Sequence, residues 1–106
     1  MNTTYEAAEP RREEVDALEG ATVLEFGTPW CGFCRAAQPL IAGAFASQAK
    51  VRHIKVEDGP GKPLGRSFRI KLWPTLVFLK DGHELARVTR PQGMEALREA
   101  LEKIGA

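Results

Sequence analysis

Three runs rich in residues that favour extended backbone predict strands of this chain, and the first and third of them are mostly apolar. They cover residues 21–26, 51–56 and 75–79. Apolar runs of this length are typical of strands that are covered on both faces. The turn dipeptide Asp81-Gly82 leads from the third run into residues 84–89, so we expect a β-hairpin there. The sheet then holds four strands, or five if residues 3–5 add a short strand at its edge.

Apolar residues at helical spacing predict four helices. The expected ranges are residues 10–18, 34 to about 48, 64–68 and 95–104. Pro39 lies inside the second helix and should kink it, because proline removes a backbone hydrogen bond. A strand–helix–strand start requires a parallel pair, whereas the hairpin adds antiparallel strands. We therefore expect an α/β fold in one domain over residues 1–106, with a mixed central sheet flanked by helices on both faces.

Composition and charge narrow the class of protein. A chain of 106 residues with 43% hydrophobic and 27% charged residues is typical of one globular domain with its own core. Fifteen basic and fourteen acidic side chains leave a net charge of +1, so we expect no nucleic-acid partner. No apolar run approaches the roughly 18 residues of a membrane span, and the first residues lack the features of a signal peptide. We expect a cytoplasmic monomer that needs no cofactor and contacts no membrane.

The two cysteines, Cys31 and Cys34, lie between the first strand and the second helix. A disulfide between them closes a very short loop and stabilises little, so redox chemistry or metal binding accounts for the pair better. At a helix start, unpaired N–H groups and the helix dipole favour a thiolate, so we expect Cys31 to be the exposed nucleophile with a low pKa. Cys34, one turn later and shielded, is close enough to attack a mixed disulfide at Cys31 and release the reduced substrate.

A metal site or an unused pair of thiols is also compatible with the two cysteines. A zinc site needs four ligands, and the remaining candidates, His53 and His83, are expected on different strands. An iron–sulfur cluster shared between two chains would also use cysteines, and an idle pair in a non-redox fold needs no function at all. The strand–turn–helix context favours thiol–disulfide exchange over all three, and we expect no metal.

Several motifs in this order together resemble the thioredoxin family. They are Val23-Leu24-Glu25-Phe26, Trp30-Cys31-Gly32-Phe33-Cys34, Pro39, Trp73-Pro74-Thr75, the Asp81-Gly82 turn and the final amphipathic helix. The resemblance covers roughly residues 20 to 105. It implies a thioredoxin fold and a protein-disulfide reductase in which Cys31 attacks and Cys34 resolves. Protein disulfides would be the substrates, and a separate reductase, such as a thioredoxin reductase, would regenerate the dithiol.

The resemblance also implies roles for residues outside the cysteine pair. Glu25 falls where thioredoxins commonly keep a buried aspartate, and burial would raise its pKa, so that it takes the proton from Cys34. The alternative is that Glu25 reaches solvent at a strand end. His53 aligns with a family lysine near that acid, and either contacts Glu25 or is an ordinary strand residue. Pro74 matches the family's cis-proline, and the alternative is an ordinary trans-proline that starts a strand. The resemblance also implies that the backbone of Trp73 contacts the substrate chain.

The chain departs from the family at four places near the expected site. Phe33 replaces the usual proline between the cysteines, which tunes the reduction potential. Gly27 stands where thioredoxins usually have a tryptophan, and Trp73 is bulkier than the usual aliphatic residue. Arg90 lies near a rim that is normally small and contains glycine; it either favours acidic partners or is a solvated hairpin end. The expected substrate-binding surface consists of Trp30, Phe33, Trp73, Pro74 and Arg90.

Two further functions are compatible with the sequence alone. A non-catalytic binding or chaperone-like module would hold partners through the apolar side chains of this same surface, and would keep its activity without the cysteines. An oxidase or isomerase would use the same cysteines and differ in reduction potential, which the sequence does not reveal.

Overall fold

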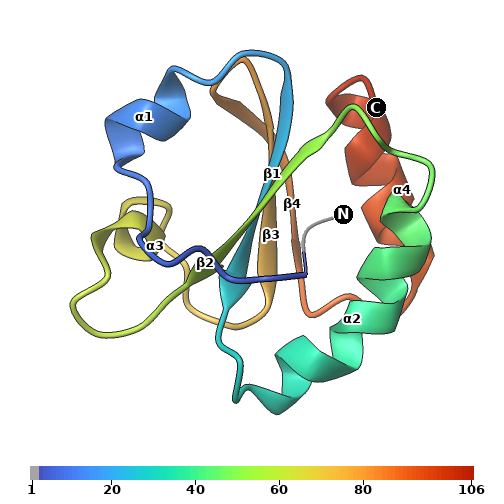
Figure 1. Cartoon of the computed structure of the whole chain (residues 1–106). Helices are drawn as coiled ribbons and strands as arrows, with labels where there is room; N and C mark the ends of the chain where they lie inside the picture. The colour runs from blue at the N-terminus through green and yellow to red at the C-terminus, as the bar shows by residue number, and fades with distance from the viewer. Residues whose placement is uncertain (1–2) are drawn as a thin grey trace.

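The structure is a computed structural model that describes residues 3–106 and contains a four-stranded mixed sheet between two layers of helices (Figure 1). The elements follow in the order α1 (Arg12–Asp16), β1 (Ala21–Gly27), α2 (Gly32–Phe45), β2 (Arg52–Glu57), α3 (Pro63–Ser67), β3 (Thr75–Lys80), β4 (His83–Thr89) and α4 (Met94–Lys103). The predicted α/β fold class, with helices on both faces of a mixed sheet, is confirmed. Within the described residues, no helix is long and apolar enough to cross a bilayer.

The sheet has the strand order β2-β1-β3-β4, so β1 and β3 are its central strands. β1 pairs in parallel with β2 and antiparallel with β3, and β3 forms the predicted hairpin with β4. Tyr5 makes one isolated parallel bridge to Lys55, and the described residues contain no fifth strand. Glu25 lies in the middle of β1, opposite Lys55 on one side and Leu76 on the other. This central position carries its side chain into the interior.

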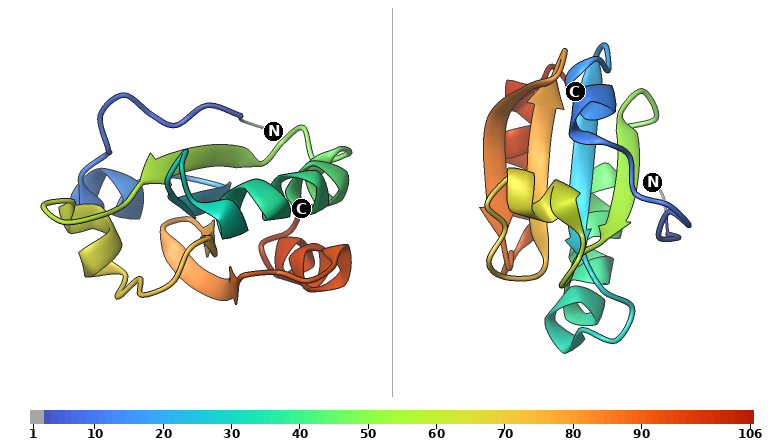
Figure 2. Two further views of the ribbon diagram at one scale, coloured as in Figure 1. Left: turned by 90° about the horizontal axis from the view of Figure 1, so that it is seen from below. Right: turned by 90° about the vertical axis from the view of Figure 1, so that its left-hand side faces the viewer.

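Two apolar clusters hold the helices against opposite faces of the sheet. α2 and α4 cover one face, and α1 and α3 cover the other (Figure 2). The first cluster joins Ile41 and Phe45 of α2 to Leu97 and Leu101 of α4 over the sheet. The second joins Val15, Leu64, Leu24, Phe26, Phe68, Val56, Val77 and Leu79. Burial on both faces explains why the central strands are mostly apolar.

The helix ends differ from the predicted ones by a few residues. α1 is shorter than expected, and its start is fixed where the Glu14 carboxylate accepts a hydrogen bond from the Arg11 N–H at 2.9 Å. α2 begins at Gly32, before the predicted residue 34, and continues through Pro39 to Phe45. The earlier start has a functional consequence, because it makes Cys31 the N-cap residue of α2.

Candidate functional site

Cys31 and Cys34 are both free thiols at the N-terminal end of α2. The extended backbone of Cys31 turns its sulfur back over the first turn, where Sγ accepts a hydrogen bond from the Cys34 N–H at 3.1 Å. A sulfur in the N-cap position receives one of the unpaired N–H groups and lies at the positive end of the helix dipole. Both effects favour negative charge on the Cys31 sulfur.

The expectation that Cys31 is an exposed thiol is wrong. Only 8% of Cys31 is accessible, against 2% of Cys34. The physical reason is the N-cap geometry itself, because the hydrogen bond folds the Cys31 sulfur onto the helix end. The exposed groups beside it are the rings of Trp30 and Phe33, which are 71% and 59% accessible. A partner disulfide that approaches this sulfur therefore meets exposed aromatic rings next to it in the chain.

The Cys34 thiol is protonated at neutral pH. Burial, helped by the interaction with the Cys31 sulfur, raises the pKa of Cys34 to about 12. A thiol with such a pKa is a poor nucleophile until its proton is removed. Any reaction of Cys34 therefore depends on a base within the site.

Beneath the cysteines, Glu25 is fully buried and surrounded by hydrogen-bond donors. Its Oε1 shares a hydrogen bond of 2.9 Å with Nε2 of His53, and its Oε2 accepts one from Nε2 of Gln38 at 2.9 Å. Nζ of Lys55 lies 3.6 Å from Oε2 and donates to Oε1 of Gln38 at 3.0 Å. The Gln38 amide also donates to the Cys34 carbonyl at 2.9 Å, which links this buried network to the second cysteine. The alternatives of a solvent-facing Glu25 and of a His53 without contact to it are therefore wrong.

The prediction that the pKa of Glu25 is raised is wrong. Burial is the largest single influence and does raise the pKa, but hydrogen bonds from His53 and Gln38 and the charge of Lys55 together outweigh it. The net result is a pKa below the ordinary value of 4.5. Burial of Glu25 follows from the strand pattern, whereas the combined effect of its three partners depends on distances that only the folded structure gives.

We expect the Glu25→Gln variant to lose about 3–5 kcal/mol of stability at neutral pH, because Lys55 is left buried without its counter-charge. A carboxyl whose pKa is lowered on folding stabilises the fold above its unfolded pKa, and this contribution disappears as the pH falls through the folded pKa. The deficit of the variant should therefore shrink below about pH 4.5. Urea unfolding of both proteins at neutral and at acidic pH measures this difference.

Glu57→Gln is the matched control, since Glu57 lies only partly buried at the end of β2. It should change the free energy of unfolding by less than about 0.5 kcal/mol at either pH. An equal deficit of Glu25→Gln at both pH values would show that ionised Glu25 does not stabilise the fold.

The residues of the expected substrate-binding surface lie together around the cysteines. The Trp73–Pro74 peptide bond is cis, so the trans alternative is wrong. The rings of Trp30 and Trp73 meet edge to face with centroids 5.6 Å apart, and the Arg90 guanidinium lies 3.9 Å from the centroid of the Phe33 ring. Arg90 is half-buried and donates from Nε to the Trp73 carbonyl at 2.8 Å, so it is not a solvated hairpin end. The Trp73 carbonyl thus accepts a hydrogen bond from Arg90, although the backbone of Trp73 was expected to contact a substrate chain.

Sequence reasoning missed three residues of the site, namely Gln38, Lys55 and Tyr5. Gln38 follows Cys34 by one helical turn and Lys55 lies opposite Glu25 in the strand register, so helix and strand periodicity could have indicated both. Tyr5 had no comparable signal. A Cβ on Gly27 would lie 2.6 Å from Sγ of Cys34 and 3.2 Å from the Tyr5 hydroxyl, so both groups converge where Gly27 has no side chain.

The chain is similar to known proteins over most of its length. A family model described as Thioredoxin matches residues 3–103. Thioredoxin Asp f 28 from Aspergillus fumigatus is 30% identical over 87 residues, which are 82% of this chain and 81% of that protein. Protein disulfide-isomerase A2 from Pongo abelii is 36% identical over 84 residues, 76% of this chain but 15% of that protein. The solved structure of reduced thioredoxin 2 from Pseudomonas aeruginosa PAO1 is 58% identical with a TM-score of 0.86, and the match covers 98% of this chain and 96% of that one.

Proposed function

This chain belongs to the thioredoxin family and is a thiol–disulfide oxidoreductase, and we propose that it acts as a protein-disulfide reductase. The observation that carries the proposal is the Cys31 sulfur at the N-cap of α2, hydrogen-bonded by the N–H of a buried and protonated Cys34. In this arrangement the Cys31 sulfur is stabilised as the nucleophile, and the Cys34 thiol stays unreactive until a mixed disulfide has formed. The similarity to thioredoxins does not favour the non-catalytic binding module.

In the proposed reaction, the Cys31 thiolate attacks one sulfur of the substrate disulfide, whose S–S bond breaks and releases the first substrate thiolate. Cys34 then loses its proton and attacks the Cys31 sulfur of the mixed disulfide. The second substrate thiolate leaves, and Cys31 and Cys34 are joined by the disulfide. Two electrons have passed to the substrate, and its two thiolates take up protons.

Glu25 is the proposed acceptor of the Cys34 proton. The fully buried carboxylate is ionised at neutral pH, as its lowered pKa requires, and Gln38 bridges it to the backbone carbonyl of Cys34. The same low pKa makes it hold the proton only briefly before passing it on. The cost of this proton transfer is the difference between the two pKa values, so the raised pKa of Cys34 and the lowered pKa of Glu25 both add to it.

The proposed substrates are protein disulfides that lie against Trp30, Phe33, Trp73, Pro74 and Arg90. We further propose one thioredoxin-like domain over residues 1–106 that acts as a monomer. Its disulfide would be reduced by a separate enzyme, such as a thioredoxin reductase, in the cytoplasm, where the redox poise keeps dithiols reduced.

The proposal is tested by reduction of insulin with dithiothreitol as the electron donor, together with titration of the cysteine pair against glutathione. We expect faster reduction than with dithiothreitol alone and a reduction potential of about −270 mV, as for a reducing thioredoxin. A potential of about −180 to −120 mV would instead support an isomerase or oxidase. A rate no higher than that of dithiothreitol alone would refute the reductase.

A further inference from the structure

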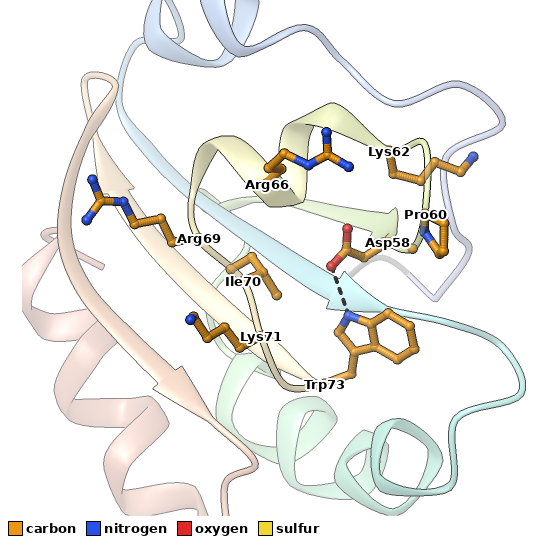
Figure 3. A pocket seen from close by; sticks show the side chains of 9 residues that line it. Asp58, Pro60, Lys62, Arg66, Arg69, Ile70, Lys71 and Trp73 are labelled. Carbon is orange, nitrogen blue, oxygen red and sulfur yellow. Dashed lines mark hydrogen bonds between the residues drawn. The ribbon is translucent and has the colours of Figure 1, made fainter.

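A cavity of about 520 Å³ lies between the loop that follows β2, the short helix α3 and the segment that precedes β3 (Figure 3). Trp73 lines this cavity and also meets Trp30, the residue before Cys31, edge to face. A substrate chain that contacts Trp73 therefore lies at the mouth of the cavity. The cavity falls within the range of about 300–1,000 Å³ that is typical of binding pockets.

Four basic side chains line the cavity. They are Lys62, Arg66, Arg69 and Lys71. Within residues 3–106, none of these four side chains has a hydrogen bond or an ion pair. Arg11, Arg12 and Arg87 differ, because each forms an ion pair with a nearby carboxylate. A chain with a net charge of +1 thus gathers an unneutralised positive cluster at one place.

Asp58, the acidic residue of the cavity lining, does not neutralise this cluster. Its Oδ2 accepts a hydrogen bond from Nε1 of Trp73 at 2.9 Å, drawn as the dashed line in Figure 3. Its carboxylate also packs closely against Gly65 of α3, where any side chain would collide with it. Asp58 thus holds the Trp73 ring in place at the edge of the cavity. Asp58 therefore leaves the four cations of the lining without a partner carboxylate within the described residues.

We propose that this cavity binds an acidic segment of the protein whose disulfide is being reduced. Clustered basic groups beside a reactive site attract segments of opposite charge and raise their rate of association. The two arginines also offer forked donors that match carboxylates. The proposal rests on the proposed function, because it assigns a recognition site to the substrate of the same cysteine pair.

The test compares two peptides that share one intramolecular disulfide and differ in four flanking residues, all glutamate in one and all glutamine in the other. Each peptide is made in two versions, one with the four residues before the disulfide and one with them after it. We expect the glutamate peptide to be reduced with about tenfold higher kcat/KM at low salt. This preference should fall towards parity at about 0.5 M salt, because the charges lie at the surface. Lys62→Glu/Arg66→Glu should abolish or reverse the preference.

The matched control is Lys50→Glu/Lys80→Glu, which reverses two exposed charges outside the cavity and should keep the preference. Insulin reduction by each variant reports whether it is folded and active. Active wild-type protein without a preference for glutamate would refute the acidic-segment site and leave the reductase standing, whereas failure of insulin reduction would refute the reductase itself. Equal loss in both double variants would also overturn the site, as would binding of inorganic phosphate without any peptide preference.

Discussion

Cys31→Ser is expected to lower dithiothreitol-driven reduction of insulin by at least about a thousandfold, because the variant has no sulfur to form the mixed disulfide. The substitution is well matched to the structure. Serine is among the preferred N-cap residues, so its hydroxyl oxygen can accept the Cys34 N–H hydrogen bond that the sulfur accepts now. We therefore expect the fold to be kept while the reaction is lost.

The measurement is the rate of insulin precipitation, with the midpoint of thermal unfolding as the control for folding. An unchanged midpoint together with lost activity assigns the nucleophile to Cys31. If the variant kept more than about a tenth of the wild-type rate, attack by Cys31 could not be the route of the reaction.

Cys34→Ser is expected to accumulate partners as mixed disulfides on Cys31, since attack remains possible and resolution is removed. Cys34→Ser should trap partners and Cys31→Ser should not, and the structure gives a different reason for this difference than exposure of Cys31. The accessible fractions of Cys31 and Cys34, 8% and 2%, differ too little to explain selective trapping by themselves. Burial explains it instead. It is the largest cause of the raised pKa of Cys34 and persists when Cys31 is replaced, so Cys34 stays a thiol at neutral pH and does not attack a foreign disulfide.

Both serine variants are incubated with oxidised insulin and with a cell extract, and the products are separated without reductant and identified by mass spectrometry. Cys34→Ser should form the 1:1 adduct with an insulin chain, and Cys31→Ser should form little. Equal trapping by the two variants would contradict the division of labour between the cysteines. The proteins captured from the extract would identify candidate substrates.

The helices and strands could be predicted because their signals are local. The apolar run of β1 and the spacing of Ile41, Phe45, Leu97 and Leu101 reflect burial against neighbours, whichever neighbours those are. The same holds for the cysteines, since a Cys-x-x-Cys pair between a strand and a helix meets the helix dipole in any such fold. Errors at the helix ends came from cap contacts such as the one between Arg11 and Glu14.

The electrostatics of the site could not be predicted in the same way, because they are sums over contacts between distant segments. Glu25 was correctly expected in a buried strand, yet its pKa depends on His53, Gln38 and Lys55, and their combined effect reverses that of burial. The sign of such a sum requires every distance, and a sequence supplies none of them.

The sequence by itself determined the fold class and the reactive cysteine pair, because hydrophobic periodicity and a helix start act over a few residues. Only the tertiary structure decided that Arg90 covers Phe33 and the Trp73 carbonyl, and that Asp58 holds the Trp73 ring. These contacts join residues 15 or more positions apart in the chain. Groups so far apart in the sequence come within hydrogen-bonding distance only when the chain folds. Hydrogen bonds and charge interactions depend steeply on that distance, so the sequence alone does not reveal them.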